Sequence, residues 1–424
     1  MTLNSYWNRA SPVQIDCGFP CTPEGDVWTV SNAGGDAPNS LQTLESATYN
    51  SVNAVYARVV DAVGADRVLE MSRRLGITSE HLKPYPSITL GAFGVSPLEM
   101  AAAYSTFANY GRQLDPYLIE RITDANGDIV YEHSPEPEQV LTKPIAAAVV
   151  NTLEQVVSSG TGTRANIDRP QAGKTGTANE SVDVWFVGFI PQYTTAVWVG
   201  NADRPVPLED IVVWNDLEGR EEPISRAYGG TLAAPIWKQF MLEATDGLPV
   251  RGFLPDPLGT ERYYETPETM VPDLRGMSRT EMETAIYEAH LDVAYAEVAS
   301  NSSKGKVLGW SPKTETEVPQ GSAVEIRISS GVPPNVDVPD LIGLPVEAVG
   351  DALSGTDFGW TAEPVPVVEP ELWGIVVSSS PSPGSSVPPG TLITVGVGVE
   401  PELPPEPELP PETEPRPETE PPST

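Results

Sequence analysis

The residues best suited to chemistry lie in the run 171–180, with the sequence Gln-Ala-Gly-Lys-Thr-Gly-Thr-Ala-Asn-Glu. Lys174 offers a positive charge and Thr175 a hydroxyl group, and Gly176 leaves room for a ligand to lie against the backbone. An apolar segment follows at residues 183–189. The pattern is typical of an edge strand at a binding site. The alternative is an edge strand whose lysine lies in solvent, and these residues alone would favour it.

A second polar group, Ser51-Val52-Asn53, lies between two predicted helices. The first helix is expected at about residues 41–49. The second is expected at residues 54–63, with valines on one face and Gly64 as its end. In most proteins a Ser-x-Asn sequence between helices is ordinary helix-cap chemistry. Taken alone, the group therefore favours a structural role over a catalytic one.

The charge balance argues against one class of function. The sequence has 25 Lys and Arg residues against 59 Asp and Glu residues, a formal net charge of −34. Nucleic-acid binding needs a basic face, so we expect no nucleic-acid partner. No stretch has the length and apolar character of a transmembrane helix or a signal peptide.

The two cysteines, Cys17 and Cys21, leave three interpretations open: a small-loop disulfide, half of a metal site, or two unrelated residues. The three histidines, His81, His133 and His290, lie far apart in the sequence. Their scarcity disfavours both a metal site and a Ser-His-Asp mechanism. We favour a disulfide formed outside the cytoplasm, and we expect no metal and no cofactor.

The rest of the first half predicts helices and short strands. Residues 1–37 are rich in Gly, Pro, Asn and Asp and are expected to form loops. A capping box at residues 96–99 opens a helix, and Asn126-Gly127 predicts the turn of a hairpin. A further helix begins near Pro144 and ends in the polar loop Ser-Gly-Thr-Gly-Thr-Arg at residues 159–164.

The elements after that loop surround Lys174 in the sequence. Residues 172–200 predict one antiparallel hairpin. Residues 201–228 are expected to form a polar loop, and a last helix is expected to begin within residues 229–237.

The C-terminal part contains a repeat. Residues 271–277, Val-Pro-Asp-Leu-Arg-Gly-Met, recur as Val-Pro-Asp-Leu-Ile-Gly-Leu at residues 338–344, and residues 318–321 recur in part at 387–390. Each copy combines a helix with alternating strands, which indicates a small α+β unit. Residues 399–424 are Pro, Glu and Thr almost throughout, so we expect a disordered or extended acidic tail.

The order of these motifs resembles the transpeptidase domain of class A penicillin-binding proteins, over about residues 15–245. The motifs are Ser-x-Asn, Gly-Thr-Gly-Thr-Arg, Lys-Thr-Gly-Thr, Trp-Phe-Val-Gly and Ala-Ala-Pro-Ile-Trp. Each is weak alone, and their order makes the match strong. The two repeats resemble PASTA domains. The combination is similar to a cell-wall synthase of an actinobacterial or related Gram-positive cell, which implies a location outside the cytoplasm.

The resemblance implies an α+β fold with five segments. The first is a partial transpeptidase domain in which an antiparallel sheet packs with helices, followed by a linker, two small α+β PASTA repeats and the tail. Their expected bounds are residues 1–245, 246–268, 269–332, 336–398 and 399–424.

The resemblance also implies acyl transfer. In the family, a serine from a Ser-x-x-Lys motif attacks the D-Ala-D-Ala amide of a peptidoglycan stem peptide, and an amine from a neighbouring stem peptide resolves the acyl-enzyme. β-Lactams mimic the donor and acylate the same serine. The partners implied are therefore stem peptides and β-lactams, with muropeptides as possible ligands of the PASTA repeats.

Three residues match the family's catalytic positions. Ser51 would shuttle a proton to the leaving amine, Asn53 would hold the substrate amide, and Lys174 would supply positive potential near Ser51 and the substrate carboxylate.

Three more match its substrate-binding positions. Thr175 and Thr177 would bind the carboxylate through their hydroxyl groups, with Gly176 between them. The Thr177 backbone N–H would form half of an oxyanion hole, where loss of one donor costs about 3–4 kcal/mol of barrier in comparable enzymes.

The sequence departs from the family at the first motif. Residues 1–50 contain no lysine, and the one Ser-x-x-Lys in the chain, Ser303 to Lys306, lies inside the first repeat. We therefore expect a C-terminal fragment that lacks its nucleophile, its glycosyltransferase domain and its membrane anchor, and that is inactive alone.

Three hypotheses follow. The chain is part of a D,D-transpeptidase, a non-catalytic protein that binds the cell wall through its repeats, or a structural spacer. A serine β-lactamase is a variant of the first, and the repeats argue against it.

Overall fold

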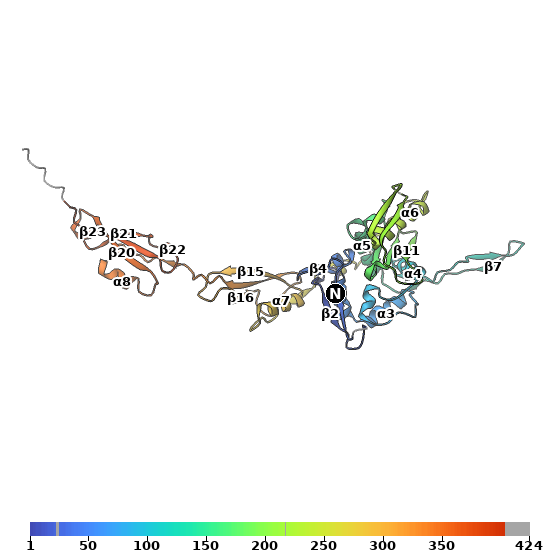
Figure 1. Cartoon of the computed structure of the whole chain (residues 1–424), viewed down its shortest axis with the longest axis horizontal. Coiled ribbons are helices and arrows are strands. Elements are labelled where there is room, and N and C mark those ends of the chain that lie inside the picture. The colour runs from blue at the N-terminus through green and yellow to red at the C-terminus, as the bar shows by residue number, and fades with distance from the viewer. Residues whose placement is uncertain (23–24, 217, 403–424) are drawn as a thin grey trace, which may run out of the picture. The chain divides into compact units, whose positions relative to one another are not determined.

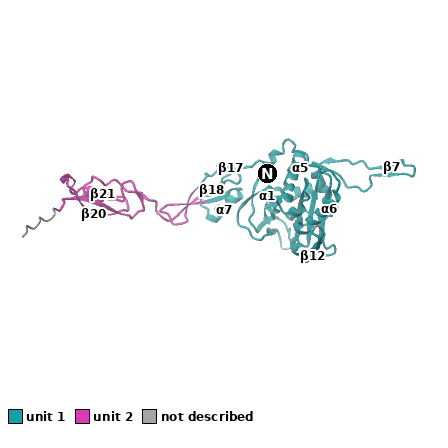
Figure 2. Ribbon diagram, turned by 90° about the horizontal axis from the view of Figure 1, so that it is seen from above, with its two compact units in different colours: residues 1–294, 310–325 teal, residues 295–309, 326–424 magenta. Residues whose placement is uncertain are grey.

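The structure is a computed structural model that describes residues 1–22, 25–216 and 218–402. It divides into two compact units: residues 1–294 with 310–325, and residues 295–309 with the chain from residue 326 onward (Figure 2). Helices and mainly antiparallel strands in several small sheets make up the described chain, so the expected α+β class is confirmed. From residue 403 onward, the expected acidic tail lies outside the described residues.

A three-stranded antiparallel sheet places the Lys174 strand at its edge. Its order is β11 (Thr194–Gly200), β10 (Asp183–Phe189) and β9 (Ala172–Thr177). The prediction of a single hairpin over residues 172–200 is wrong, because the chain turns between β9 and β10. Glu180 and Ser181 take left-handed backbone conformations there, with φ of 55° and 54°.

Helices cover both faces of this sheet (Figure 1). On one face, α5 (Lys143–Ser158) and α4 (Pro97–Ala108) pack against Phe189 of β10. On the other face, α6 (Ala234–Ala244) packs against Val184 and Phe186. Because side chains alternate along a strand, β10 contributes to both halves of the core.

The contact between α6 and β10 is especially close. The Trp237 side chain is fully buried, meets the Phe186 ring edge-on at 5.3 Å between centroids, and donates its indole N–H to the Gly188 carbonyl at 3.3 Å. A Cβ atom at Gly188 would lie 2.6 Å from Phe186 and 2.8 Å from Trp237. Only glycine therefore fits at this position.

The first 37 residues form strands, so the expectation of a loop was wrong there. β1 (Tyr6–Asn8) pairs with β4 (Leu41–Thr43), and β2 (Val13–Asp16) pairs with β3 (Val27–Val30). Val13, Ile15 and Val30 are buried against Ala54 and Ala57. Short alternating apolar positions drive this pairing, and the surrounding turn residues hide them in the sequence.

The two helices around Ser51 form as expected, with one change. The first, α1, spans Leu44–Tyr49 rather than starting at residue 41, because residues 41–43 pair with β1. Thr43 caps it by accepting a hydrogen bond from the Ser46 N–H at 3.2 Å. The second helix, α2 (Asn53–Val63), ends at Gly64 and is followed by α3 (Ala65–Arg74).

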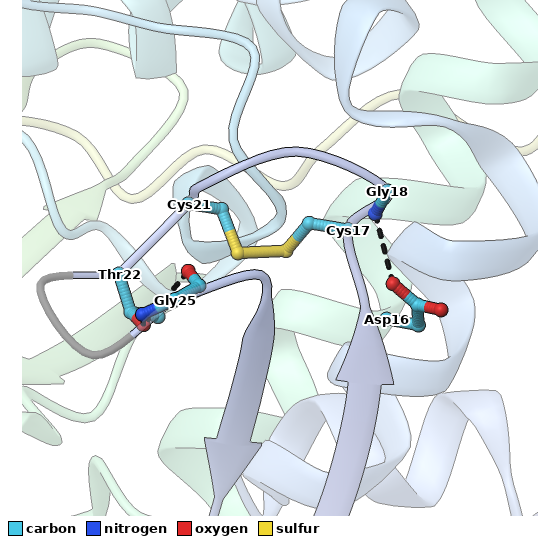
Figure 3. The surroundings of a disulfide bond; sticks show 6 residues. All are labelled: Asp16, Cys17, Gly18, Cys21, Thr22 and Gly25. Atoms are coloured by element: carbon cyan, nitrogen blue, oxygen red, sulfur yellow. Dashed lines mark hydrogen bonds between the residues drawn. A yellow bond between two sulfur atoms is a disulfide. The ribbon is translucent and has the colours of Figure 1, made fainter.

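A disulfide joins Cys17 to Cys21 across a sequence separation of four residues (Figure 3). It closes the chain at the end of β2, where the Gly18 N–H also donates to the Asp16 carboxylate at 2.9 Å. The predicted disulfide is thus confirmed.

Two hairpins flank the central elements. β6 (Arg121–Thr123) and β7 (Ile129–Glu132) form the hairpin predicted from Asn126-Gly127, and it extends away from the helices (Figure 1). Beside it, β5 (Arg112–Gln113) pairs with β8 (Glu138–Gln139).

The second hairpin, β12 (Glu209–Asn215) with β13 (Arg220–Arg226), corrects the prediction of a loop over residues 201–228. Ile211 and Val213 pack against the core, but Val212 between them is also apolar, so the sequence shows no clear alternation.

The first repeat combines one helix, α7 (Arg279–Glu288), with a strand pair and a three-stranded sheet. Strand β14 (Glu268–Met270) pairs with β17 (Glu317–Pro319). The sheet has the order β15 (Asp292–Val298), β18 (Ala323–Ser329), β16 (Val307–Ser311).

The second repeat has the same arrangement, with α8 (Val349–Ala352) as its helix. Strand β19 (Val336–Asp337) pairs with β22 (Ser386–Val387), and the sheet has the order β20 (Gly359–Pro366), β23 (Leu392–Val399), β21 (Val376–Ser380). Its own core includes the fully buried Leu341 and Ile393, which indicates an independent unit.

Replacing Gly188 by alanine is expected to destabilise the first unit by about 2–3 kcal/mol, because overpacking of a full core costs about 1–3 kcal/mol and rigid rings surround this site. Urea unfolding followed by tryptophan fluorescence measures the change. Gly252→Ala is the matched control, since a Cβ atom there meets nothing within 4 Å. Equal midpoints for the two variants would contradict the packing described here.

Candidate active site

The Lys174 and Ser51 side chains meet although 123 residues separate them in the sequence. Lys174 Nζ donates a hydrogen bond to Ser51 Oγ at 2.8 Å and a second to the Thr175 carbonyl at 3.0 Å. Strand β9 supplies the lysine, and the turn between α1 and α2 supplies the serine. Two of the residues predicted to act together are therefore in direct contact.

Ser51 sits in a strained turn. Its φ is 56°, in the left-handed region that non-glycine residues rarely adopt. Hydrogen bonds from the Ser51 and Val52 N–H groups to the last turn of α1 hold this geometry, at 3.2 Å to Thr48 and 2.9 Å to Ala47. The turn directs the serine hydroxyl towards the sheet edge and away from α2. Strain of this kind persists only where the surroundings impose it.

Burial changes the acidity of Lys174. Removal of the ammonium group from water lowers its pKa to about 8, since the charged form loses hydration. The amine therefore remains mostly protonated at pH 7 and loses its charge as the pH rises through 8.

The two threonines of β9, Thr175 and Thr177, are two positions apart and therefore lie on the same face of the strand. Thr175 Oγ1 lies 2.7 Å from Thr161 Oγ1, and Thr177 Oγ1 accepts a hydrogen bond from the Gly229 N–H at 3.0 Å. Because the Thr177 oxygen already accepts a bond, its hydroxyl hydrogen remains available to donate to an anion.

The edge position of β9 also exposes backbone donors. The Ala178 N–H donates to the Asp183 carbonyl on the β10 side at 2.8 Å. Since successive N–H groups of a strand point in opposite directions, the Thr177 N–H faces the open edge. This is the backbone group for which the family resemblance implied a role as an oxyanion donor.

Two glycine-containing segments lie close to the strand. A Cβ atom at Gly160 would lie 2.3 Å from the Tyr49 carbonyl, and one at Gly229 would lie 2.6 Å from the Gly176 carbonyl. A Cβ atom at Gly230 would lie 2.2 Å from the Thr161 carbonyl. Glycine is thus required wherever these segments approach the site.

The Asn53 side chain is not directed at Lys174. Its amide donates to the Ser31 carbonyl at 3.0 Å, and it stands at the first position of α2. The contact ties α2 to the loop after β3 (Val27–Val30). Of the three predicted catalytic residues, Ser51 and Lys174 are in contact in the structure. Asn53 follows Ser51 by two positions, and its side chain bonds Ser31 instead.

An open pocket of about 330 Å³ lies beside Ser51. Its walls come from the loop after β3 and the turn after α1, together with one arginine: residues 32–37, residues 50–52 and Arg9. Ser51 therefore contacts Lys174 and also lines this pocket.

Sequence reasoning missed two supporting contacts. Arg164 bonds the Thr231 carbonyl at 3.0 Å and the Glu222 carboxylate at 2.9 Å, which fixes the segment carrying Gly229 and Gly230. The contact between Thr161 and Thr175 was also missed, because the sequence identified Thr161 only as part of the Gly-Thr-Gly-Thr-Arg motif. Glu222 lay in the segment predicted as a loop, so no sequence signal identified it.

Comparison with known families agrees with this geometry. Residues 21–241 match the model of the penicillin-binding protein transpeptidase domain, and residues 269–330 and 336–399 each match the PASTA domain.

Curated relatives match part of their length. Penicillin-binding protein 1A of Aquifex aeolicus is 38% identical over 231 residues, covering 54% of this chain and 29% of that protein. Penicillin-binding protein 2D of Bacillus subtilis is 32% identical over 260 residues, covering 59% of this chain and 35% of that protein. The chain thus spans about a third of the length of these relatives.

Solved structures share the fold. Penicillin-binding protein 1A of Haemophilus influenzae superposes with a TM-score of 0.51 at 24% identity, covering 65% of this chain and 43% of that one. PonA1 of Mycobacterium tuberculosis gives a TM-score of 0.50 at 24% identity, covering 61% and 67%. Because the transpeptidase model matches more than half of the chain, the chain belongs to the penicillin-binding protein transpeptidase family and carries two PASTA domains after that domain.

Proposed function

We propose that residues 1–245 belong to a serine D,D-transpeptidase that cross-links peptidoglycan stem peptides. These residues form the part of its active site that binds the substrate carboxylate. The observation that carries this proposal is the 2.8 Å hydrogen bond between Lys174 Nζ and Ser51 Oγ. It supports a site in which a half-buried, charged amine and an orienting hydroxyl lie beside an open strand edge.

Lys174 attracts the C-terminal carboxylate of the donor peptide. A charge in a partly dehydrated site interacts more strongly with an anion than it would in water. Thr175 and Thr177 complete the anion site through their hydroxyl groups, and Gly176 lets the peptide lie flat against β9.

Ser51 carries the proton. A nucleophilic serine attacks the carbonyl carbon of the penultimate D-Ala, and its proton passes through Ser51 to the departing D-Ala amine as the C–N bond breaks. The Thr177 N–H stabilises the oxyanion of the tetrahedral intermediate. An amine of a second stem peptide then displaces the ester, and the serine regains its proton. Asn53 orients the substrate amide once its side chain turns from the Ser31 carbonyl.

The acylated serine of this reaction belongs to a Ser-x-x-Lys motif. The printed sequence contains none ahead of Ser51, so we propose that the chain as printed is not acylated by itself. The same feature favours a second candidate, a non-catalytic protein that binds peptidoglycan. In that case, muropeptide binding by the PASTA repeats would be the main activity.

The site is suited to work outside the cytoplasm. The Cys17–Cys21 disulfide is of a kind that persists in oxidising compartments. In the described part of the chain, no helix is both long and apolar enough to cross a membrane. We place the protein at the envelope of a Gram-positive, actinobacterial cell, where peptidoglycan is the substrate.

Fluorescent penicillin, read on a denaturing gel, tests the catalytic assignment. The printed chain is expected to remain unlabelled, whereas a version that carries a Ser-x-x-Lys segment ahead of residue 1 is expected to be labelled. In that version, Lys174→Ala should slow labelling about 100-fold, the loss typical of one transition-state donor. Lys143→Ala, at an exposed helix start, is the control. Labelling of the printed chain would show that another serine is the nucleophile.

The acidity of Lys174 gives a second test on the printed chain. Competitive acetylation with trace acetic anhydride, against free phenylalanine and read by mass spectrometry, follows each lysine as a function of pH. Lys174 should titrate near pH 8, because burial favours its neutral form. If the carboxylate site is correct, affinity for an acyl-D-Ala-D-Ala peptide falls as the pH rises from 7 to 9. A midpoint above 10 would contradict the buried position of the amine.

A further inference from the structure

The first PASTA repeat contacts the N-terminal strand of the transpeptidase region within one compact unit. Residues 310–325 of this repeat, together with residues 269–294, cluster with the chain from residue 1. In contrast, the second repeat belongs entirely to the other unit. The two copies share their sequence motifs, so the difference must arise from residues that they do not share.

Three residues of the first repeat make this contact. Gln320 Oε1 accepts a hydrogen bond from the Tyr6 N–H at 3.0 Å. The His290 ring meets the Trp7 ring edge-on, with 4.9 Å between centroids. Gly321 lies against the Tyr6 ring, where a Cβ atom would be only 2.8 Å away.

The corresponding loop of the second repeat lacks these features. The sequence Val-Pro-Gln-Gly at residues 318–321 becomes Val-Pro-Pro-Gly at residues 387–390, so Pro389 replaces the hydrogen-bonding Gln320. Gly321 and Gly390 have nearly the same backbone conformation, with φ of 83° and 81°. However, a Cβ atom at Gly390 would meet nothing within 4 Å.

The contacted strand, β1, packs against residues on both sides of Ser51. Trp7 of β1 is only 7% exposed and forms one apolar cluster with Ala47 and Val55. Val52, next to Ser51, packs against the same cluster. The strained turn at Ser51 is therefore flanked on both sides by residues that Trp7 holds.

We propose that the first PASTA repeat is a structural brace of the transpeptidase region, which positions Ser51 through Tyr6 and Trp7. Trp7 is a positioning residue, since it acts on Ser51 through Ala47, Val52 and Val55. The second repeat, which has Pro389 in place of Gln320, does not have this structural role. The role of Ser51 in catalysis rests on the function proposed above, whereas the brace itself does not.

Paired glycine substitutions in the full chain test the brace. Gly321→Asn and Gly390→Asn place the same side chain at the same backbone conformation, which asparagine tolerates, so they differ only in the clash with Tyr6. Hydrogen–deuterium exchange is then followed for peptides covering residues 44–59. Gly321→Asn should speed exchange there at least tenfold, and Gly390→Asn should leave it unchanged. Peptides from residues 172–200, away from the contact, report that the sheet remains folded.

Unchanged exchange at residues 44–59 in the Gly321→Asn protein would overturn the proposal, as would an equal increase in both variants. If Gly321→Asn gives no folded protein, Gln320→Ala removes a single acceptor and is judged by the same peptides, with the same direction expected. A tenfold increase in exchange would support the brace even if the version that carries a Ser-x-x-Lys segment is not labelled by penicillin, a result that would contradict the proposed function. The two claims therefore fail separately.

Discussion

The hydrogen bond from Lys174 Nζ to Ser51 Oγ, 2.8 Å long, links the sheet edge to the helical part of the domain. An amine can be held in this position only because β9 is an edge strand and because Ser51 adopts a left-handed turn between two helices. Burial makes the amine less basic and thereby sets the pH range in which the site is positively charged. The carboxylate binding that we propose for the strand rests on this arrangement.

The same constraint explains why so much of the surrounding chain is glycine. Segments 160–162 and 229–230 must approach β9 and the end of α1 within distances that exclude a Cβ atom. Arg164 and Glu222 then lock one of these segments through a partly buried ion pair of 2.9 Å. The threonine hydroxyls are thus held in position before any ligand arrives, which reduces the reorganisation that binding requires.

Sequence patterns predicted the elements with strong local signals. The helix break at Ser51, the end of α2 at Gly64, the capping box of α4 and the Asn126-Gly127 turn were all found. The strands of the first 37 residues were missed, because alternations of three or four residues among turn residues carry little periodic signal. The seven-residue strands β12 and β13 were missed, because a run of apolar residues in β12 and charged residues in β13 interrupt the alternation. Within the site, the meeting of Ser51 and Lys174 came from the family resemblance. The contacts of Thr161, Arg164 and Asn53 depend on tertiary packing and could not be obtained from the sequence.

The carboxylate site that we propose consists of Lys174, Thr175 and Thr177 of β9, beside Ser51. The most direct test is the chemical-shift change that an N-acetylated Lys-D-Ala-D-Ala peptide causes in the 15N-labelled chain at pH 7, compared with the same peptide ending in a carboxamide. We expect shifts at the amides of residues 174–177 and at Ser51 with the carboxylate peptide, and much smaller shifts with the carboxamide. Equal shifts for both peptides, or shifts confined to the PASTA repeats, would contradict it.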